Sequence, residues 1–136
     1  MKEPPAVRVR TAKRNDADSL VMFSLAMAWE TERRRLDQAR LRRGVLAVLS
    51  NPARGSFIIA ETTEKNRRRV VGQLLLTYEW SDWRNGVFWW IQSVYVIAEA
   101  RRQGVFSALY QHVRQCALQA GNVVGLRLYV ERSNQP

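Results

Sequence analysis

The residues best suited to chemistry lie within positions 94–109, where an apolar segment runs into a short basic loop and then into a helical pattern. The loop consists of Arg101, Arg102, Gln103 and Gly104. Backbone N–H groups at a helix start are unpaired and carry the positive end of the helix dipole, so they attract anions such as a pyrophosphate. Gly104 lets a ligand approach the backbone, and the arginines add charge. This stretch therefore predicts a phosphate-binding loop.

Two glutamates are candidates for a general base that would accept a proton from a reacting group. Glu79 ends an expected strand beside an aromatic-rich turn, and Glu131 lies at the edge of the last expected strand. The alternative, an exposed carboxylate at a strand end, explains each of them better. The sequence leaves both readings open.

Aromatic residues crowd the expected hairpin around residues 80–90. We take Trp80, Trp83 and Trp90 as candidate walls of a pocket for a cationic amine, because aromatic faces attract cations. Gln92 has no titrating proton and is expected to orient a bound group. Core packing or a subunit interface explains the rings equally well.

Hydrophobic periodicity and turn residues predict the elements that position these side chains. The expected strands and helices are a strand at residues 7–10, a helix capped by Asn15 or Asp16, a helix at 36–49, strands at 57–60, 70–78 and 87–97, a helix at 104–120 and a strand at 125–131. The apolar strand at 87–97 is expected to be buried on both faces. The order β-α-α-β-β-β-α-β predicts one α/β domain, residues 1–136, with a mixed sheet.

Composition limits the class of protein. With 46% apolar and 25% charged residues, the chain is typical of a globular protein. We find no apolar run that would span a bilayer and no signal peptide, and we expect a cytoplasmic protein without a membrane partner. One cysteine and one histidine argue against a metal site. The net charge of +10 would attract polyanions, but no nucleic-acid-binding motif accompanies it, so we expect no nucleic-acid partner.

The element order and its central motif resemble the GNAT family of acyl-CoA-dependent N-acetyltransferases. That family's motif places Arg or Gln, two residues, Gly, one residue, and Gly or Ala after an apolar strand. Arg101, Gly104 and Phe106 occupy these positions, and the resemblance extends over residues 7–134. Phe106 replaces a small residue, and it would either crowd the loop or lean inward against the core.

The resemblance implies that the chain uses acetyl-CoA as acyl donor and an unidentified amine as acceptor, with direct attack in one complex. It implies that the pantetheine arm pairs with the backbone of Val94, Tyr95 and Val96, and that the Val96 N–H polarises the thioester carbonyl. It further implies that the rest of the donor is held by residues of the loop, the helix start and the C-terminal segment: Arg101, Arg102, Gln103, Gly104, Val105, Phe106, Ser107 and Asn134.

The family continues beyond the position of Asn134 with a helix that often carries a tyrosine, followed by two strands, whereas this sequence ends at Pro136. We therefore expect a C-terminally truncated GNAT-like fold. Its last strand would be an exposed sheet edge, and such edges seek partners, so we expect a homodimer. Two functions remain open: an N-acetyltransferase, and a weak or inactive module that binds acyl-CoA or self-associates.

Overall fold

The computed structural model describes residues 6–129. Its helices and strands are β1 (Val7–Thr11), α1 (Ala17–Glu32), α2 (Gln38–Ser50), β2 (Ser56–Glu64), β3 (Arg67–Ser81), β4 (Gly86–Val96), α3 (Val105–Ala120) and β5 (Val123–Leu128), with short 3-10 helices at Arg14–Asp16 and Ala98–Ala100. Within residues 6–129, no helix is both long enough and apolar enough to cross a membrane.

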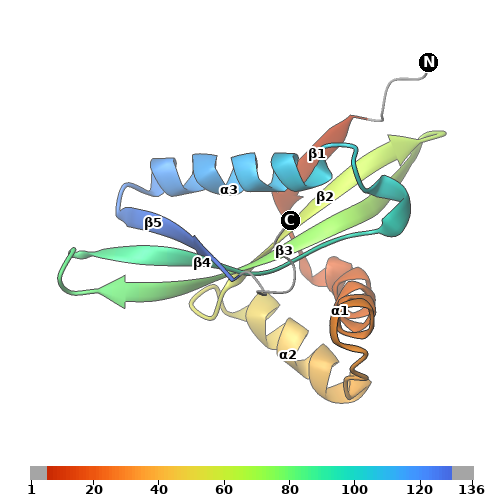
Figure 1. The fold of residues 1–136 in the computed structure, drawn as a ribbon, viewed down its shortest axis with the longest axis horizontal. Coiled ribbons are helices and arrows are strands. Elements are labelled where there is room, and N and C mark those ends of the chain that lie inside the picture. The colour runs from red at the N-terminus through yellow and green to blue at the C-terminus, as the bar shows by residue number, and fades with distance from the viewer. Residues whose placement is uncertain (1–5, 130–136) are drawn as a thin grey trace.

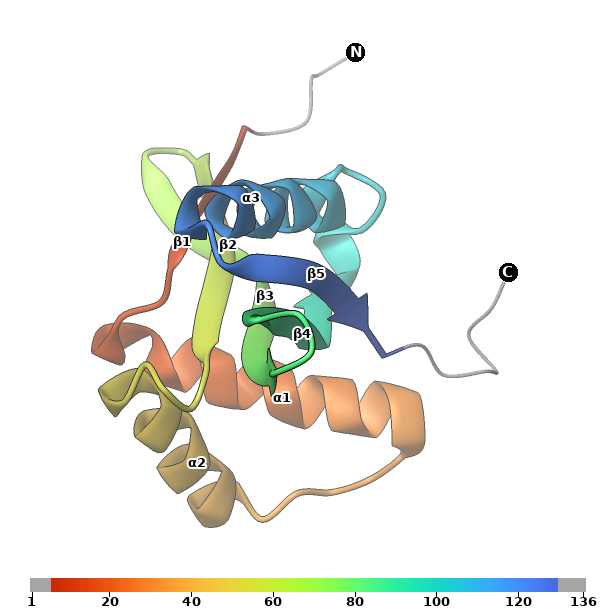
Figure 2. The ribbon, with the colours of Figure 1, turned by 90° about the vertical axis from the view of Figure 1, so that its left-hand side faces the viewer.

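The five strands form one mixed sheet in the order β1-β2-β3-β4-β5. The first four strands are antiparallel neighbours, and β5 pairs parallel with β4 after the crossover through α3. Helix α3 covers one face of the sheet, and α1 and α2 cover the other (Figures 1 and 2). The predicted fold class and element order are confirmed.

Short turns connect β2 to β3 and β3 to β4. Lys65 and Asn66 join β2 to β3 with φ angles of 50° and 64°, and Asn85 precedes β4 with a φ of 47°. Asparagine tolerates this left-handed region better than most residues, and paired positive φ angles match the twist of a hairpin. Asn66 and Asn85 therefore adopt the backbone conformation that these two hairpin turns require.

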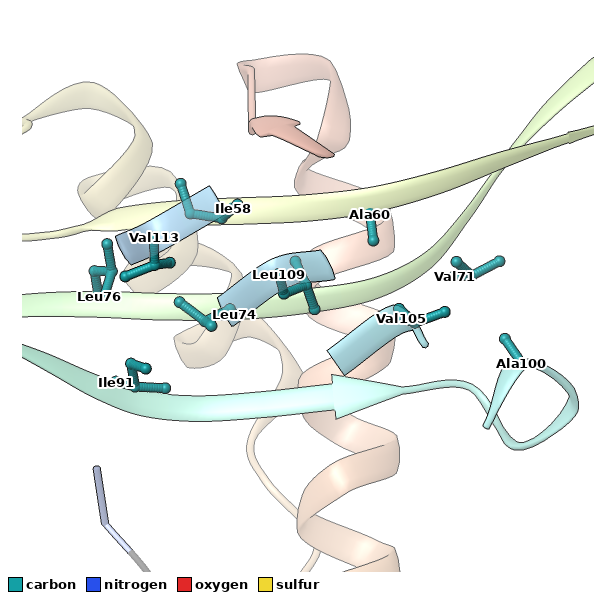
Figure 3. Packing of buried hydrophobic residues seen from close by; sticks show 10 residues of the cluster. All are labelled: Ile58, Ala60, Val71, Leu74, Leu76, Ile91, Ala100, Val105, Leu109 and Val113. Atoms are coloured by element: carbon teal, nitrogen blue, oxygen red, sulfur yellow. The ribbon is translucent and has the colours of Figure 1, made fainter. Parts of the chain in front are cut away.

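Two apolar clusters hold the layers together. One lies between the sheet and α3 and includes Leu74, Ile91 and Leu109 (Figure 3). The other lies between the sheet and α1 and α2. At Gly72 of β3 an added Cβ would lie 3.0 Å from Val105 Cγ1. The glycine thus lets the first turn of α3 rest directly on the sheet.

Several details differ from the sequence predictions. Strands β2 (Ser56–Glu64) and β3 (Arg67–Ser81) are longer than the predicted 57–60 and 70–78. The Asp16 carboxylate does not cap α1; it accepts hydrogen bonds from the Lys13 N–H at 2.7 Å and the Arg10 guanidinium at 2.8 and 3.0 Å. The last strand begins at Val123 rather than residue 125. Strand β4 is not buried on both faces throughout, because Gln92 is exposed.

Candidate functional site

Strands β4 and β5 pair over only part of their length. Their register runs from Val87 opposite Val123 to Ile91 opposite Leu128, and within residues 6–129 β5 does not pair with residues 92–96. A bulge lies at this point, because consecutive residues of β3 pair with Ser93 and Ile91 and leave Gln92 as the extra residue. Bulges bend a strand. The end of β4 therefore leaves β5 and creates a split at the sheet edge.

Alternating hydrogen bonds decide which backbone groups face this split. The Ile97 N–H donates to the Val71 carbonyl at 2.9 Å, across the β3–β4 ladder. In an antiparallel ladder every second residue bonds the neighbouring strand, so the N–H groups of Val94 and Val96 point away from β3 and toward the split. The N–H groups of Val94 and Val96, in the predicted donor-binding segment, therefore face the split and not β3.

A cavity of about 910 Å³ lies on the α1 side of this split. Its lining residues come from α1 and the loop after it, from the end of β4, and from Arg101 and Tyr129. Five of the predicted site residues lie together in this lining: Gln92, Val94, Tyr95, Val96 and Arg101. The cavity is large enough for a small-molecule ligand.

The basic loop has the backbone that an anion site needs. Arg102 and Gly104 are left-handed, with φ angles of 66° and 81°, and no side chain caps the first turn of α3. A Cβ built on Gly104 would have no atom within 4 Å, so the space beside the loop is open. Free amides at the positive end of a helix dipole fit a phosphate. The loop is therefore suited to the pyrophosphate of an acyl-CoA.

The two residues that follow Gly104 point in different directions. Val105 is buried in the core below α3, so only its backbone is available to a ligand. Phe106 is exposed and lies beside Tyr110, with ring centroids 6.5 Å apart. The prediction that Phe106 could lean inward against the core is therefore wrong.

One carboxylate links the loop to the cavity wall. Oε1 of Glu30 in α1 accepts a hydrogen bond from the Tyr95 hydroxyl at 3.1 Å. Oε2 of Glu30 forms an ion pair with Arg101 at 2.7 Å. We call these three residues the Glu30 cluster. The Arg101 guanidinium lowers the pKa of Glu30, whereas burial, followed by the bond to Glu30, raises the pKa of Tyr95. Arg101 Nε also donates to the Val96 carbonyl at 2.9 Å.

A second polar contact under the cavity was also missed from the sequence. Gln73 of β3 is almost fully buried beside Tyr95, and its Nε2 donates to Ser24 Oγ of α1 at 3.2 Å. Ser24 lines the cavity. Buried polar side chains are costly unless bonded, so this contact fixes the Ser24 hydroxyl. A lone glutamine in an apolar strand was the available signal.

The predicted base Glu79 lies outside the cavity lining. Its carboxylate accepts from Trp90 Nε1 at 2.8 Å and pairs with Arg127 at 3.1 Å. We call these three residues the Glu79 cluster. Trp90 stacks on Tyr129 with ring centroids 4.7 Å apart, and Tyr129 lines the cavity. Glu79 is thus connected to the cavity through two aromatic rings.

The remaining predicted residues are dispersed. Trp80 and Trp83 are 62% and 91% exposed at the hairpin tip, away from the cavity lining. Gln92 lines the cavity, and its Nε2 donates to Thr77 Oγ1 at 2.6 Å. Glu131 and Asn134 lie outside the described residues.

Comparison with solved structures gives close matches. A possible acetyltransferase from Clostridium difficile 630 is 41% identical, with 94% of this chain and 82% of that chain covered and a TM-score of 0.85. A GNAT family acetyltransferase from Staphylococcus aureus (12% identity, 96% and 91% covered, TM-score 0.73) shares the fold. An aminoglycoside acetyltransferase from an uncultured soil metagenomic sample, solved in complex with sisomicin, also shares the fold. It is 15% identical, with 95% of this chain and 80% of that chain covered and a TM-score of 0.71.

No curated protein sequence matches the chain. The model of the acetyltransferase (GNAT) family, by contrast, matches residues 15–136, which include both the loop and the cavity wall. The family's activity is acyl-CoA-dependent acetyl transfer. The split sheet, the basic loop and these matches lead to one conclusion: the chain belongs to the GNAT acetyltransferase family.

Proposed function

We propose that this protein transfers an acetyl group from acetyl-CoA to an amine by direct attack in a ternary complex. The observation that carries the proposal is the free edge of β4. The N–H groups of Val94 and Val96 face the split between the basic loop and the cavity of about 910 Å³. A donor that lies along this edge would have its phosphates at the loop and its thioester beside the cavity.

The loop and the strand edge would share the work of holding the donor. Residues 102–107 would bind the pyrophosphate through backbone amides at the start of α3, helped by the charge of Arg102. The backbone of residues 94–96 would pair with the pantetheine amides as a further strand would. Such an arrangement fixes the thioester without requiring any particular side chain at these positions.

Val96 is the proposed electrophilic residue. Its N–H points into the split and would donate to the thioester oxygen as negative charge develops there. The neutral amine attacks the carbonyl carbon, the new C–N bond forms, the C–S bond breaks, and coenzyme A leaves as a thiolate.

The amine must lose a proton during the reaction, and Glu79 is the proposed base, acting through a water. Its side chain is 47% exposed, which gives water access to the carboxylate, and its partner Trp90 stacks on the cavity residue Tyr129. Glu131, the second candidate, lies outside the described residues. The general-base role of both residues remains a prediction.

A binding-only function is the alternative. The loop and strand edge would hold acyl-CoA equally well in a protein that does not turn it over. Release of free thiol from acetyl-CoA on addition of an amine panel distinguishes the two. Binding without thiol release would favour the module that binds but does not catalyse.

Calorimetric titration with acetyl-CoA tests the donor site, with Gly104→Glu as the disruptive variant. A carboxylate at that position should repel the pyrophosphate and weaken binding at least about a hundredfold, since charge-assisted phosphate contacts are strong. Gly121→Glu is a matched control. Gly121 ends α3 with the same φ of 81° and equally open space, so both variants carry equal backbone strain and charge.

The outcomes separate clearly. Loss of binding in Gly104→Glu with retention in Gly121→Glu supports the donor site. Equal losses in both variants, or no binding heat from the unmodified protein, would contradict it.

Sedimentation in the same buffers tests the predicted homodimer, and a monodisperse monomer would count against that prediction.

A further inference from the structure

The Glu30 cluster connects the basic loop, through Arg101, with the wall of the cavity, which contains Tyr95 and Glu30. We propose that Glu30 is the group that holds the ammonium of the acceptor amine, and that the acyl donor exposes it by drawing Arg101 to its phosphates. This inference rests on the proposed function and assigns a residue of α1 to the recognition of a cationic acceptor.

The first step of the argument is that both partners of Glu30 belong to the proposed donor site. Arg101 is the first residue of the basic loop, and Tyr95 lies between Val94 and Val96. The side chains of Val94 and Val96 pack toward α3, whereas the Tyr95 ring lies on the opposite face against Phe23 of α1. Glu30 is therefore held beside the strand edge where the thioester would lie.

The second step is that the ion pair is open to exchange, even though Arg101 Nε also donates to the Val96 carbonyl at 2.9 Å. The side chains of Arg101 and Glu30 are 47% and 43% exposed, and such exposed ion pairs contribute little to stability because water competes with them. Guanidinium–phosphate contacts are stronger and often bidentate. A pyrophosphate bound at the loop would therefore compete favourably for Arg101.

The third step concerns what remains after Arg101 moves. Glu30 would keep the hydrogen bond from the Tyr95 hydroxyl, so its carboxylate would stay oriented at the cavity wall with one oxygen released. The other acidic residue of the described cavity lining, Glu32, has no ion pair or hydrogen bond to its side chain within residues 6–129. Glu30 is thus the acid whose availability depends on the donor.

Calorimetry with acetyl-CoA tests the competition, using Glu30→Gln. Removing the competitor should tighten donor binding about twofold to fivefold, the value of an exposed ion pair. Glu32→Gln is the matched control, because it removes the same charge from the same cavity without releasing Arg101. It should change the affinity by less than about twofold. Equal affinities of the two variants, or weaker binding by Glu30→Gln, would overturn the proposal.

A double-mutant cycle with Arg101→Met isolates the contact. The tighter binding caused by Glu30→Gln should disappear in the Arg101→Met background, because no guanidinium remains to be released. An undiminished effect would show that Glu30 acts only through its general charge and would contradict the inference. Thermal unfolding of each variant checks that all of them fold.

An ammonium probe tests the second part of the proposal, the binding of the acceptor ammonium by Glu30. In amide NMR titrations with n-butylammonium chloride, the signals of Glu30 and Thr31 should shift when coenzyme A is present and shift much less without it. Glu30→Gln should abolish the response. A response that does not depend on coenzyme A, or that persists in Glu30→Gln, would refute the assignment. If the unmodified protein does not bind acetyl-CoA, the proposed function itself fails, which is a distinct result.

Discussion

The Glu30 cluster and the Glu79 cluster are built from the same parts. In each, a glutamate pairs with an arginine and accepts a hydrogen bond from an aromatic side chain: Arg101 and Tyr95 in one, Arg127 and Trp90 in the other. Their surroundings differ. Glu30 lies on α1 in the cavity wall, whereas Glu79 lies on β3 near the hairpin.

This difference shows that local chemistry does not identify the role of a carboxylate. The arginine of the Glu79 cluster also stacks on Phe88 at 3.7 Å, so it is held on three sides. The arginine of the Glu30 cluster also has further contacts, to the Val96 carbonyl at 2.9 Å and to the Tyr95 ring at 5.6 Å, but it belongs to a loop whose first helical turn has no side-chain cap. The first pair is suited to a fixed orientation, and the second is suited to exchange with an anion.

Substitutions in the two clusters should differ most in their effects on catalytic turnover. With Glu79 as the base, Glu79→Gln lowers kcat about 10²- to 10⁴-fold, the usual contribution of general base catalysis. Glu30→Gln should instead raise the KM of the amine with a smaller effect on kcat, because it removes binding. Thiol release measured over a range of amine concentrations separates the two parameters. A Glu79→Gln variant with normal kcat would remove Glu79 from the chemistry.

Swapping the glutamate and the arginine within each cluster should produce a smaller difference, measured as acetyl-CoA affinity. Combining Glu30→Arg with Arg101→Glu should weaken acetyl-CoA binding about tenfold or more, because the loop gains a negative charge beside the phosphates. Combining Glu79→Arg with Arg127→Glu keeps the same pair away from the loop and should leave donor affinity within about twofold. Calorimetry measures both.

The two exchanges also control for folding, since each preserves an ion pair. Comparable melting temperatures would show that any loss of donor binding is local. Equal losses of affinity in both exchanges would mean that the clusters do not differ in the way the structure indicates.

The pH dependence of stability should give the smallest effect. The pKa of Glu30 is lowered from its ordinary 4.5, chiefly by the hydrogen bond from Arg101. A lowered carboxylate pKa stabilises the folded state above the unfolded value, and this contribution is lost as the pH falls through the folded value. The melting temperatures of the unmodified protein and Glu30→Gln should therefore converge below pH 4.5. A difference that stays constant from pH 7 to about pH 3 would contradict the pairing.

Local signals predicted most of the fold. Hydrophobic patterns located the strands, and turn residues between them indicated where the strands end. The boundaries were less predictable where a neighbouring residue competed for a side chain. Asp16 has the chemistry of a helix cap, but Arg10 and the Lys13 N–H bind its carboxylate instead.

The proposed donor site could be suggested from the sequence because it is one continuous segment, residues 94–107. The cavity wall could not, because it forms only when α1 packs on the sheet. Glu30 lies 65 residues before Tyr95 and 71 before Arg101, and nothing in its neighbourhood in the sequence distinguishes it from other surface glutamates. The contact between Ser24 and Gln73 was not predictable either, because the two residues lie 49 positions apart in the sequence.

The parallel pairing of β5 with β4 has a consequence for the order in which the molecule assembles. Strands β2, β3 and β4 form from short turns, whereas β5 reaches its place only after the whole of α3 has crossed the sheet. Contacts that close long loops form late and open first. We therefore expect amide hydrogens of β5 to exchange with solvent before those of β3. A bound acyl donor, which would touch both sides of the split, should slow that exchange.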